Sequence, residues 1–93
     1  MEKFRVIVTK TASKDLDSLE PETKLKLLRS IKNLEISPFP NGGSIKKLKG
    51  FKNSFYRLRE GDFRIIYKMN DREVVALFVV DRKDLERALK SIL

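Results

Sequence analysis

Three arginines, Arg57, Arg59 and Arg64, fall within a stretch of alternating charged and apolar residues that spans 56–67. The alternation on both sides of Glu60-Gly61 predicts two short strands joined by a tight turn there, since glycine readily adopts a positive φ. Side chains alternate across a strand, so the three arginines are expected to share one face. Guanidinium groups hold phosphate through paired hydrogen bonds, and the face is therefore either a phosphate site or a solvated basic surface.

The predicted turn also fixes which residues lie opposite each other. A two-residue loop at Glu60-Gly61 sets Arg59 opposite Asp62 and Arg57 opposite Arg64. Like charges directly across a sheet repel by roughly 0.2–1 kcal/mol, so an anion between Arg57 and Arg64 would relieve the repulsion. The other face of this hairpin is apolar and is expected to face a core; it carries Tyr56, Leu58, Phe63, Ile65 and Tyr67.

The composition restricts the possible chemistry. The 93 residues, which we interpret as one domain over 1–93, include no cysteine and no histidine. Disulfides and thiolate metal sites are therefore excluded, and the usual general base near neutral pH is missing. No apolar run approaches the roughly 18 residues of a membrane span, and the N-terminal residues lack the pattern of a signal peptide. We expect a cytoplasmic protein with no metal site, no small-molecule cofactor and no membrane partner.

The chain is strongly basic. Lysine and arginine number 21 against 13 acidic residues, which gives a net charge of +8. Abundant surface charge also occurs in heat-adapted proteins, but ion-pair enrichment raises both signs together. An excess of cations favours a polyanionic partner such as nucleic acid, a ribosome or an acidic protein.

The remaining elements predict an α+β fold: a small, mostly antiparallel sheet, with an N-terminal helical hairpin on one face and a short C-terminal helix. The first helix is expected to be capped by Thr11 or Ser13 and the last by Asp81. Residues 45–50 either attach the preceding loop to the core or extend the arginine face through Lys46, Lys47 and Lys49. Along the chain we expect a strand over 2–10, helices after residues 11 and 20, a loop over 37–44, the hairpin over 56–67, a buried strand over 73–80 and a helix after 81.

The chain resembles the RelE/ParE superfamily of toxins from toxin–antitoxin pairs. The matching segments are 12–16, 47–50, 56–67 and 81–85, in the same order along the chain. The resemblance implies the fold just described. In the RelE branch it also implies metal-independent cleavage of messenger RNA in the ribosomal A site, where a ribose 2′-hydroxyl attacks the neighbouring phosphate.

The same resemblance implies roles for individual residues. Arg57 and Arg59 match basic active-site positions, Arg64 matches the arginine that holds the scissile phosphate, and Arg82 matches one that assists proton transfer or stabilises charge. Lys46, Lys47 and Lys49 would contact ribosomal RNA. Active members usually carry a tyrosine shortly after the last arginine, often with a histidine nearby. This chain has neither, and Glu86 near that position is either a base or a surface partner of Arg82 or Lys90.

The implied partners are an acidic or amphipathic antitoxin, the ribosome and messenger RNA. Two other functions remain open from the residues. One is poisoning of DNA gyrase, as in ParE-type members, which agrees with the missing tyrosine and histidine. The other is binding of RNA or the ribosome without cleavage. The three functions share one fold, so the fold alone does not distinguish them.

Overall fold

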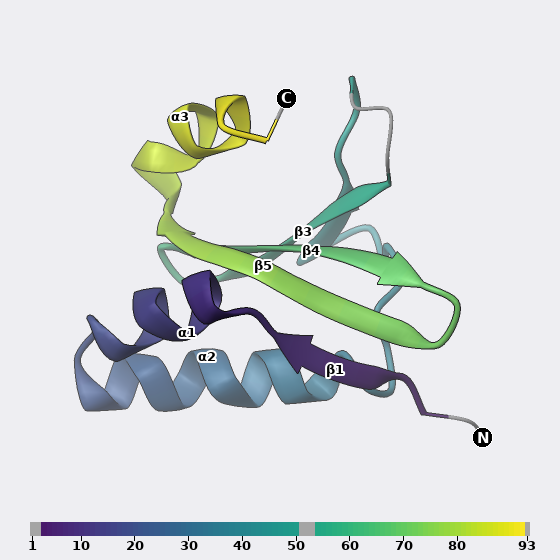
Figure 1. The fold of residues 1–93 in the computed structure, drawn as a ribbon, viewed down its shortest axis with the longest axis horizontal. Helices are drawn as coiled ribbons and strands as arrows, with labels where there is room; N and C mark the ends of the chain where they lie inside the picture. The colour runs from purple at the N-terminus through teal and green to yellow at the C-terminus, as the bar shows by residue number, and fades with distance from the viewer. Residues whose placement is uncertain (1–2, 51–53, 93) are drawn as a thin grey trace.

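A five-stranded mixed sheet forms the centre of the protein, seen here in a computed structural model that describes residues 3–50 and 54–92. The strand order is β1-β5-β4-β3-β2, with β1 parallel to β5 and every other neighbouring pair antiparallel. The predicted α+β fold is confirmed (Figure 1). The elements are β1 (Arg5–Val8), α1 (Lys10–Asp17), α2 (Pro21–Asn33), β2 (Ile45–Lys47), β3 (Phe55–Glu60), β4 (Phe63–Asn70), β5 (Glu73–Asp81), the 3₁₀ helix η1 (Arg82–Asp84) and α3 (Leu85–Lys90).

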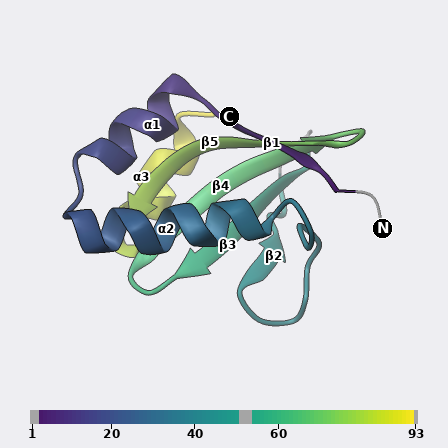
Figure 2. The same ribbon diagram turned by 90° about the horizontal axis from the view of Figure 1, so that it is seen from below.

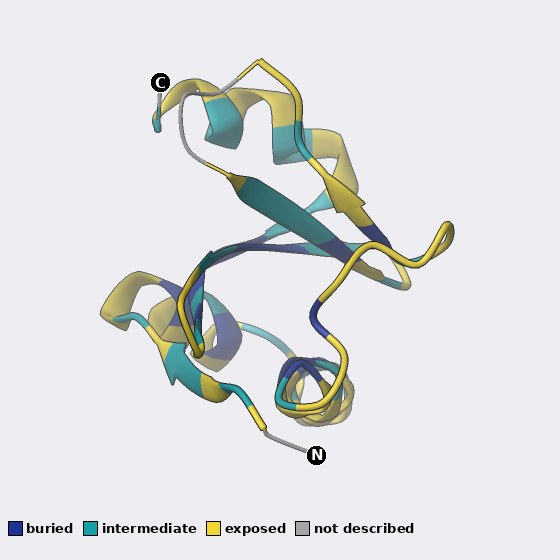
Figure 3. Ribbon diagram, turned by 90° about the vertical axis from the view of Figure 1, so that its right-hand side faces the viewer, coloured by how far each residue is buried: buried dark blue, intermediate teal, exposed yellow. Residues whose placement is uncertain are grey.

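Helices cover both faces of the sheet. The hairpin of α1 and α2 packs on one face, whereas α3 lies on the opposite side (Figures 1 and 2). Buried residues are concentrated between the sheet and the α1–α2 hairpin (Figure 3). The core there contains Ala12, Leu16, Leu27, Ile31 and Leu34 from or beside the helices, and Leu58, Ile65, Tyr67, Val74, Ala76 and Val79 from the strands.

The arginine hairpin has a different register from the one predicted. Its two-residue loop is Gly61-Asp62, so that Glu60 pairs with Phe63 and Arg59 pairs with Arg64. Gly61 has a φ of 59°, and it is the only central residue of this turn with a positive φ. A turn of this kind requires glycine at its first central position, whereas a loop at Glu60-Gly61 would place glutamate there. The error is two residues, so each side chain keeps its predicted face.

Two further predictions are corrected along the chain. Residues 45–47 form a strand, β2, although the sequence predicted three strands rather than four after the helical hairpin. Thr9, and not Thr11 or Ser13, caps α1: its hydroxyl accepts a hydrogen bond from Ala12 N at 3.1 Å. The predicted cap at Asp81 is confirmed, with its carboxylate accepting from Lys83 N at 3.1 Å, but it begins η1 before α3.

The side of β5 that extends beyond β1 is completed by side chains of the α1 segment. The backbone N–H of Val79 donates to a carboxylate oxygen of Asp15 at 2.9 Å, and the hydroxyl of Thr9 donates to the carbonyl of Leu77 at 2.9 Å. These bonds satisfy backbone groups that an unpaired strand edge would leave to solvent. In the described part of the chain, no helix is long and apolar enough to cross a membrane.

Tyr67 connects the sheet to the loop that follows α2. Its side chain is fully buried, its hydroxyl donates to the carbonyl of Pro38 at 2.6 Å, and its ring stacks on Tyr56 with centroids 5.5 Å apart. Burial, and secondarily Tyr56, raises the pKa of the Tyr67 phenol. The predicted position of Tyr67 in the core is confirmed. Its hydroxyl is used in the hydrogen bond to the loop at Pro38.

Replacing Tyr67 by phenylalanine is expected to lower the free energy of unfolding at neutral pH by about 1–2 kcal/mol, because the buried carbonyl of Pro38 loses its donor. A second effect appears in alkali. Above the ordinary phenol pKa of 10.0 the unfolded chain releases the Tyr67 proton while the folded protein retains it, so stability falls as pH rises. Urea unfolding between pH 8 and 11 should show that the free energy of unfolding falls less steeply with pH in Y67F than in the native protein. Equal slopes would contradict the raised pKa of the Tyr67 phenol.

Candidate functional site

The arginine face, which we define as Arg57, Arg59 and Arg64, lies on the side of the sheet opposite the α1–α2 hairpin. Leu58 and Ile65, their neighbours along β3 and β4, belong to the core on the hairpin side, so the alternating arginines project the other way. Arg59 pairs directly with Arg64, and Arg57 is the next residue of β3 on that face. The structure therefore brings together the three cations that the sequence placed on one surface.

Arg57 is the most constrained member of the arginine face. Its Nε and Nη2 atoms are buried and have no hydrogen-bond partner among the described residues. Burial lowers the pKa of Arg57, and the charges of Arg64 and then Arg59 lower it further. A buried donor without a partner costs roughly 1–3 kcal/mol, and more when it is charged. The fold keeps this cation at an energetic cost that a bound anion would offset.

The turn between β3 and β4 holds Arg64 in place. The Nη1 atom of Arg64 donates to the carbonyl oxygens of Gly61 and Phe63, at 3.0 Å in each case. Only part of its guanidinium is used in this way, since the group carries five N–H donors. Arg59, in contrast, is exposed. The site thus combines a half-buried cation with two buried nitrogen atoms, an oriented cation and an exposed one.

Arg82 reaches the same turn from the end of β5. Its backbone N–H donates to the carbonyl of Asp62 at 2.8 Å, and its Nε lies 3.8 Å from a carboxylate oxygen of Asp62. Asp62 was predicted to lie opposite Arg59, but the corrected register moves it into the loop, where its carboxylate pairs with Arg82 instead. Both side chains are mostly exposed, so the pair is weak and Arg82 can exchange it for another anion.

Glu86 is exposed and is not paired with any arginine in the described part of the chain. Among the described residues it forms no hydrogen bond and no ion pair, and the alternatives of pairing with Arg82 or Lys90 are both wrong. From the sequence, Arg82 and Glu86 were predicted to lie one turn apart on a single helix. Arg82 belongs instead to η1, ahead of α3, so the spacing of an α-helix does not apply between them.

The three lysines after the loop separate into different positions. Lys46 pairs directly with Arg57 and therefore extends the arginine face onto β2. Lys47 pairs with Tyr56 and projects to the other side, and Lys49 is an exposed residue beyond the strand. Lys68, which the sequence analysis did not single out, also lies on this face because it alternates with Arg64 along β4. The alternation that located the arginines was sufficient to find it.

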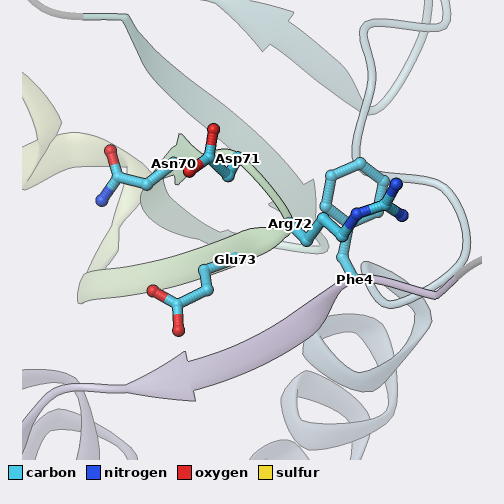
Figure 4. Close-up of a pocket in the computed structure, with 5 residues that line it drawn as sticks. All are labelled: Phe4, Asn70, Asp71, Arg72 and Glu73. Atoms are coloured by element: carbon cyan, nitrogen blue, oxygen red, sulfur yellow. The ribbon is translucent and has the colours of Figure 1, made fainter.

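A wide depression of about 810 Å³ lies away from these residues, at the turn between β4 and β5 (Figure 4). Phe4 and Arg72 line one end of it, and Asn70 and Glu73 the other. Glu73 forms an ion pair with Arg5 across the β1–β5 junction. The chemistry of the arginine face therefore belongs to the sheet surface and not to this depression. Within residues 3–50 and 54–92, no group of three or more acidic side chains is arranged to hold a metal ion.

Comparison with known proteins relates this chain to bacterial and archaeal toxins. Residues 6–87, which include the three residues of the arginine face and Arg82, match the family described as ParE toxin of the type II toxin–antitoxin system parDE. RelE1, a candidate toxin of Methanocaldococcus jannaschii, is 33% identical over 84 residues, covering 88% of this chain and 92% of that protein.

Solved structures agree in fold. A chain of the RelE–RelB complex of Pyrococcus horikoshii has a TM-score of 0.73 at 32% identity, covering 86% of this chain and 96% of that chain. A chain of the toxin–antitoxin complex RelBE2 of Mycobacterium tuberculosis has a TM-score of 0.75 at 26% identity, covering 86% of this chain and 99% of that one. The sequence and fold similarities therefore extend over most of the chain.

Proposed function

Because the chain belongs to the RelE/ParE superfamily of toxins from toxin–antitoxin systems, we propose that it inhibits translation as a ribosome-dependent endoribonuclease. The reaction is attack of a ribose 2′-hydroxyl on the adjacent phosphate of messenger RNA in the A site, with the 5′-oxygen as the leaving group. The observation that carries the proposal is Arg57, a half-buried residue whose guanidinium has two buried, unpartnered nitrogen atoms and whose charge interacts with those of Arg64 and Arg59.

The arginines supply charge where the reaction creates it. Negative charge accumulates on the phosphate oxygens in a phosphorane-like transition state, and preorganised donors stabilise it most when they need no rearrangement. In this mechanism Arg57 and Arg64 hold the scissile phosphate, and the exposed Arg59 extends the contact along the strand. Arg82 leaves Asp62 to stabilise the departing oxygen, because an exposed pair is readily exchanged. Lys46, Lys47 and Lys49 contact ribosomal RNA.

The arginines do not supply a general base for the 2′-hydroxyl proton, since arginine remains protonated and is a poor proton acceptor. Positioning alone contributes a large share of the barrier reduction in a reaction between two groups of one RNA strand. We therefore assign both the acceptor of the 2′-hydroxyl proton and the donor of a proton to the departing 5′-oxygen to the ribosome-bound RNA environment rather than to Glu86, which forms no hydrogen bond or ion pair with the arginines among the described residues.

Replacing Glu86 by glutamine is expected to leave the rate of A-site cleavage within about twofold of the native value, because Glu86 is assigned no part in proton transfer. Loss of a positioned general base would instead lower the rate roughly 100- to 10,000-fold. Single-turnover cleavage on programmed ribosomes, followed between pH 5 and 8, measures the effect. A hundredfold loss in E86Q, together with loss of an acidic limb in the pH profile, would instead identify Glu86 as the base.

The partner proposed for the free toxin is an acidic or amphipathic antitoxin. Its acidic residues would neutralise the arginine face, and its apolar residues would cover Leu25 and Leu28, which are 49% and 38% exposed on α2. The Pyrococcus horikoshii and Mycobacterium tuberculosis relatives were solved as complexes of toxin and antitoxin.

The deciding experiment is primer extension on a messenger bound to programmed ribosomes, with free RNA and toxin-free samples as controls. Cuts confined to the A-site codon, and present only with ribosomes, are the expected result. The second candidate is inhibition of DNA gyrase, favoured by the matched family, which is described as ParE toxin, and by the absence of a tyrosine after Tyr67. Inhibition of supercoiling without RNA cleavage would select this second activity.

A further inference from the structure

A pocket lies beside the arginine face, between the start of β3 and the C-terminal end of α3. Its volume is about 460 Å³, and its lining includes Ser54, Phe55, Lys68, Asn70 and Ile92. The α3 segment lies on the same side of the sheet as the arginines, opposite the α1–α2 hairpin (Figures 1 and 3). The arginine face and the pocket therefore form parts of one surface.

The register fixes how the pocket meets the arginine site. Phe55 and Arg57 are two residues apart on one face of β3, so their backbone positions are separated by about 6.6–6.8 Å. Lys68 pairs directly with Phe55 from β4. Phe55 is thus the neighbour of Arg57 on this face of β3, and Lys68 lies across from Phe55.

The lining has the composition that single-stranded nucleic acid uses. Aromatic rings stack on unpaired bases of any sequence, while cations follow the backbone beside them. Ser54 and Asn70 add a hydroxyl and an amide at the same pocket, and these groups are able to donate or accept hydrogen bonds at a base edge. Ile92 supplies an apolar surface from the other side.

We propose that this pocket binds the unpaired nucleobase attached to the phosphate held at Arg57, with the ring of Phe55 as the stacking surface. The inference rests on the proposed function to the extent that RNA is the ligand. It adds that the protein recognises a base as well as a phosphate, which the arginines alone do not achieve because phosphate contacts carry no sequence information.

The test measures binding without cleavage. A fluorescent oligoribonucleotide with 2′-deoxy substitutions cannot supply the attacking hydroxyl, and a matched oligonucleotide carries abasic residues at the same places. The native protein should bind the first about 5- to 100-fold more tightly than the second, as expected for one stacked base. F55L should reduce this ratio to below about threefold, while its affinity for polyphosphate stays within twofold.

F39L is the matched control, since Phe39 is 55% exposed in the loop after α2 and does not line the pocket. It should keep the native ratio. Equal affinity of the native protein for the two oligonucleotides would overturn the inference without the need for any variant. An equal loss on both oligonucleotides in a folded F55L protein would also overturn it. Failure of ribosomal cleavage with the base preference intact would contradict only the proposed reaction.

Discussion

Replacing Arg64 by alanine is expected to lower ribosome-dependent cleavage by about 100- to 1,000-fold and to abolish growth arrest, because the transition state loses a preorganised donor. Folding should be retained, since the side chain projects away from the main core and its bonds go to carbonyls at the turn. The measurement is single-turnover cleavage on programmed ribosomes, with circular dichroism and urea unfolding on the same samples.

Arg29→Ala is the matched control for this change. Arg29 is an exposed residue of α2, which packs on the opposite side of the sheet, and its loss alters the net charge equally. R29A should cleave within about twofold of the native protein. If R29A and R64A lose activity to the same degree, net charge rather than a phosphate contact explains the effect. An unfolded R64A protein would contradict the assignment of Arg64 to the face away from the core.

Arg57→Met is expected to have opposite effects on activity and stability. Cleavage should fall by at least about 100-fold, whereas the free energy of unfolding should rise by about 1–2 kcal/mol as two unpartnered buried donors are removed. Methionine keeps an unbranched stem, and the repulsion from Arg59 and Arg64 also disappears. Urea unfolding at neutral pH with an unchanged m value measures the stability.

Arg59→Met serves as the control for the stability effect, because Arg59 is exposed and its nitrogen atoms are accessible to water. Its unfolding free energy should change by less than about 0.5 kcal/mol. Adding sulfate provides a second comparison, since an anion that binds only the folded state stabilises it. Sulfate should raise the urea concentration at the unfolding midpoint more for the native protein than for R57M. A destabilised R57M would contradict the idea that Arg57 is held at an energetic cost.

The sequence was sufficient to predict the faces of the hairpin but not its pairing. Apolar residues at every second position distinguish the core side of β3 and β4, and this distinction survives a shift of two residues. The exact register depends on which central position of the turn holds glycine, and alternation does not contain that information. The predicted pairings of Arg57 and Arg59 were therefore wrong, although their shared face was right.

Contacts between segments that are distant in the chain could not be predicted from the sequence. The pairing of Arg82 with Asp62 needs the end of β5 beside the turn, and the pocket at Phe55 needs α3 folded over the sheet. Neither contact has a local sequence signal. Strand β2 was missed for a different reason: it has only three residues, too few for a periodic pattern, and exists because β3 offers it a partner.

The parallel pairing of β1 with β5 has a consequence for how the protein is made. Val6 lies beside Val74 in the sheet, so its partner is synthesised 68 residues later. Contacts between such distant segments form slowly, because a long stretch of chain must be ordered before they are gained. The nascent protein therefore cannot complete its sheet until β5 has emerged from the ribosome that makes it. The sheet is therefore completed only late in synthesis. A product truncated before β5 lacks the strand that joins β1 to β4.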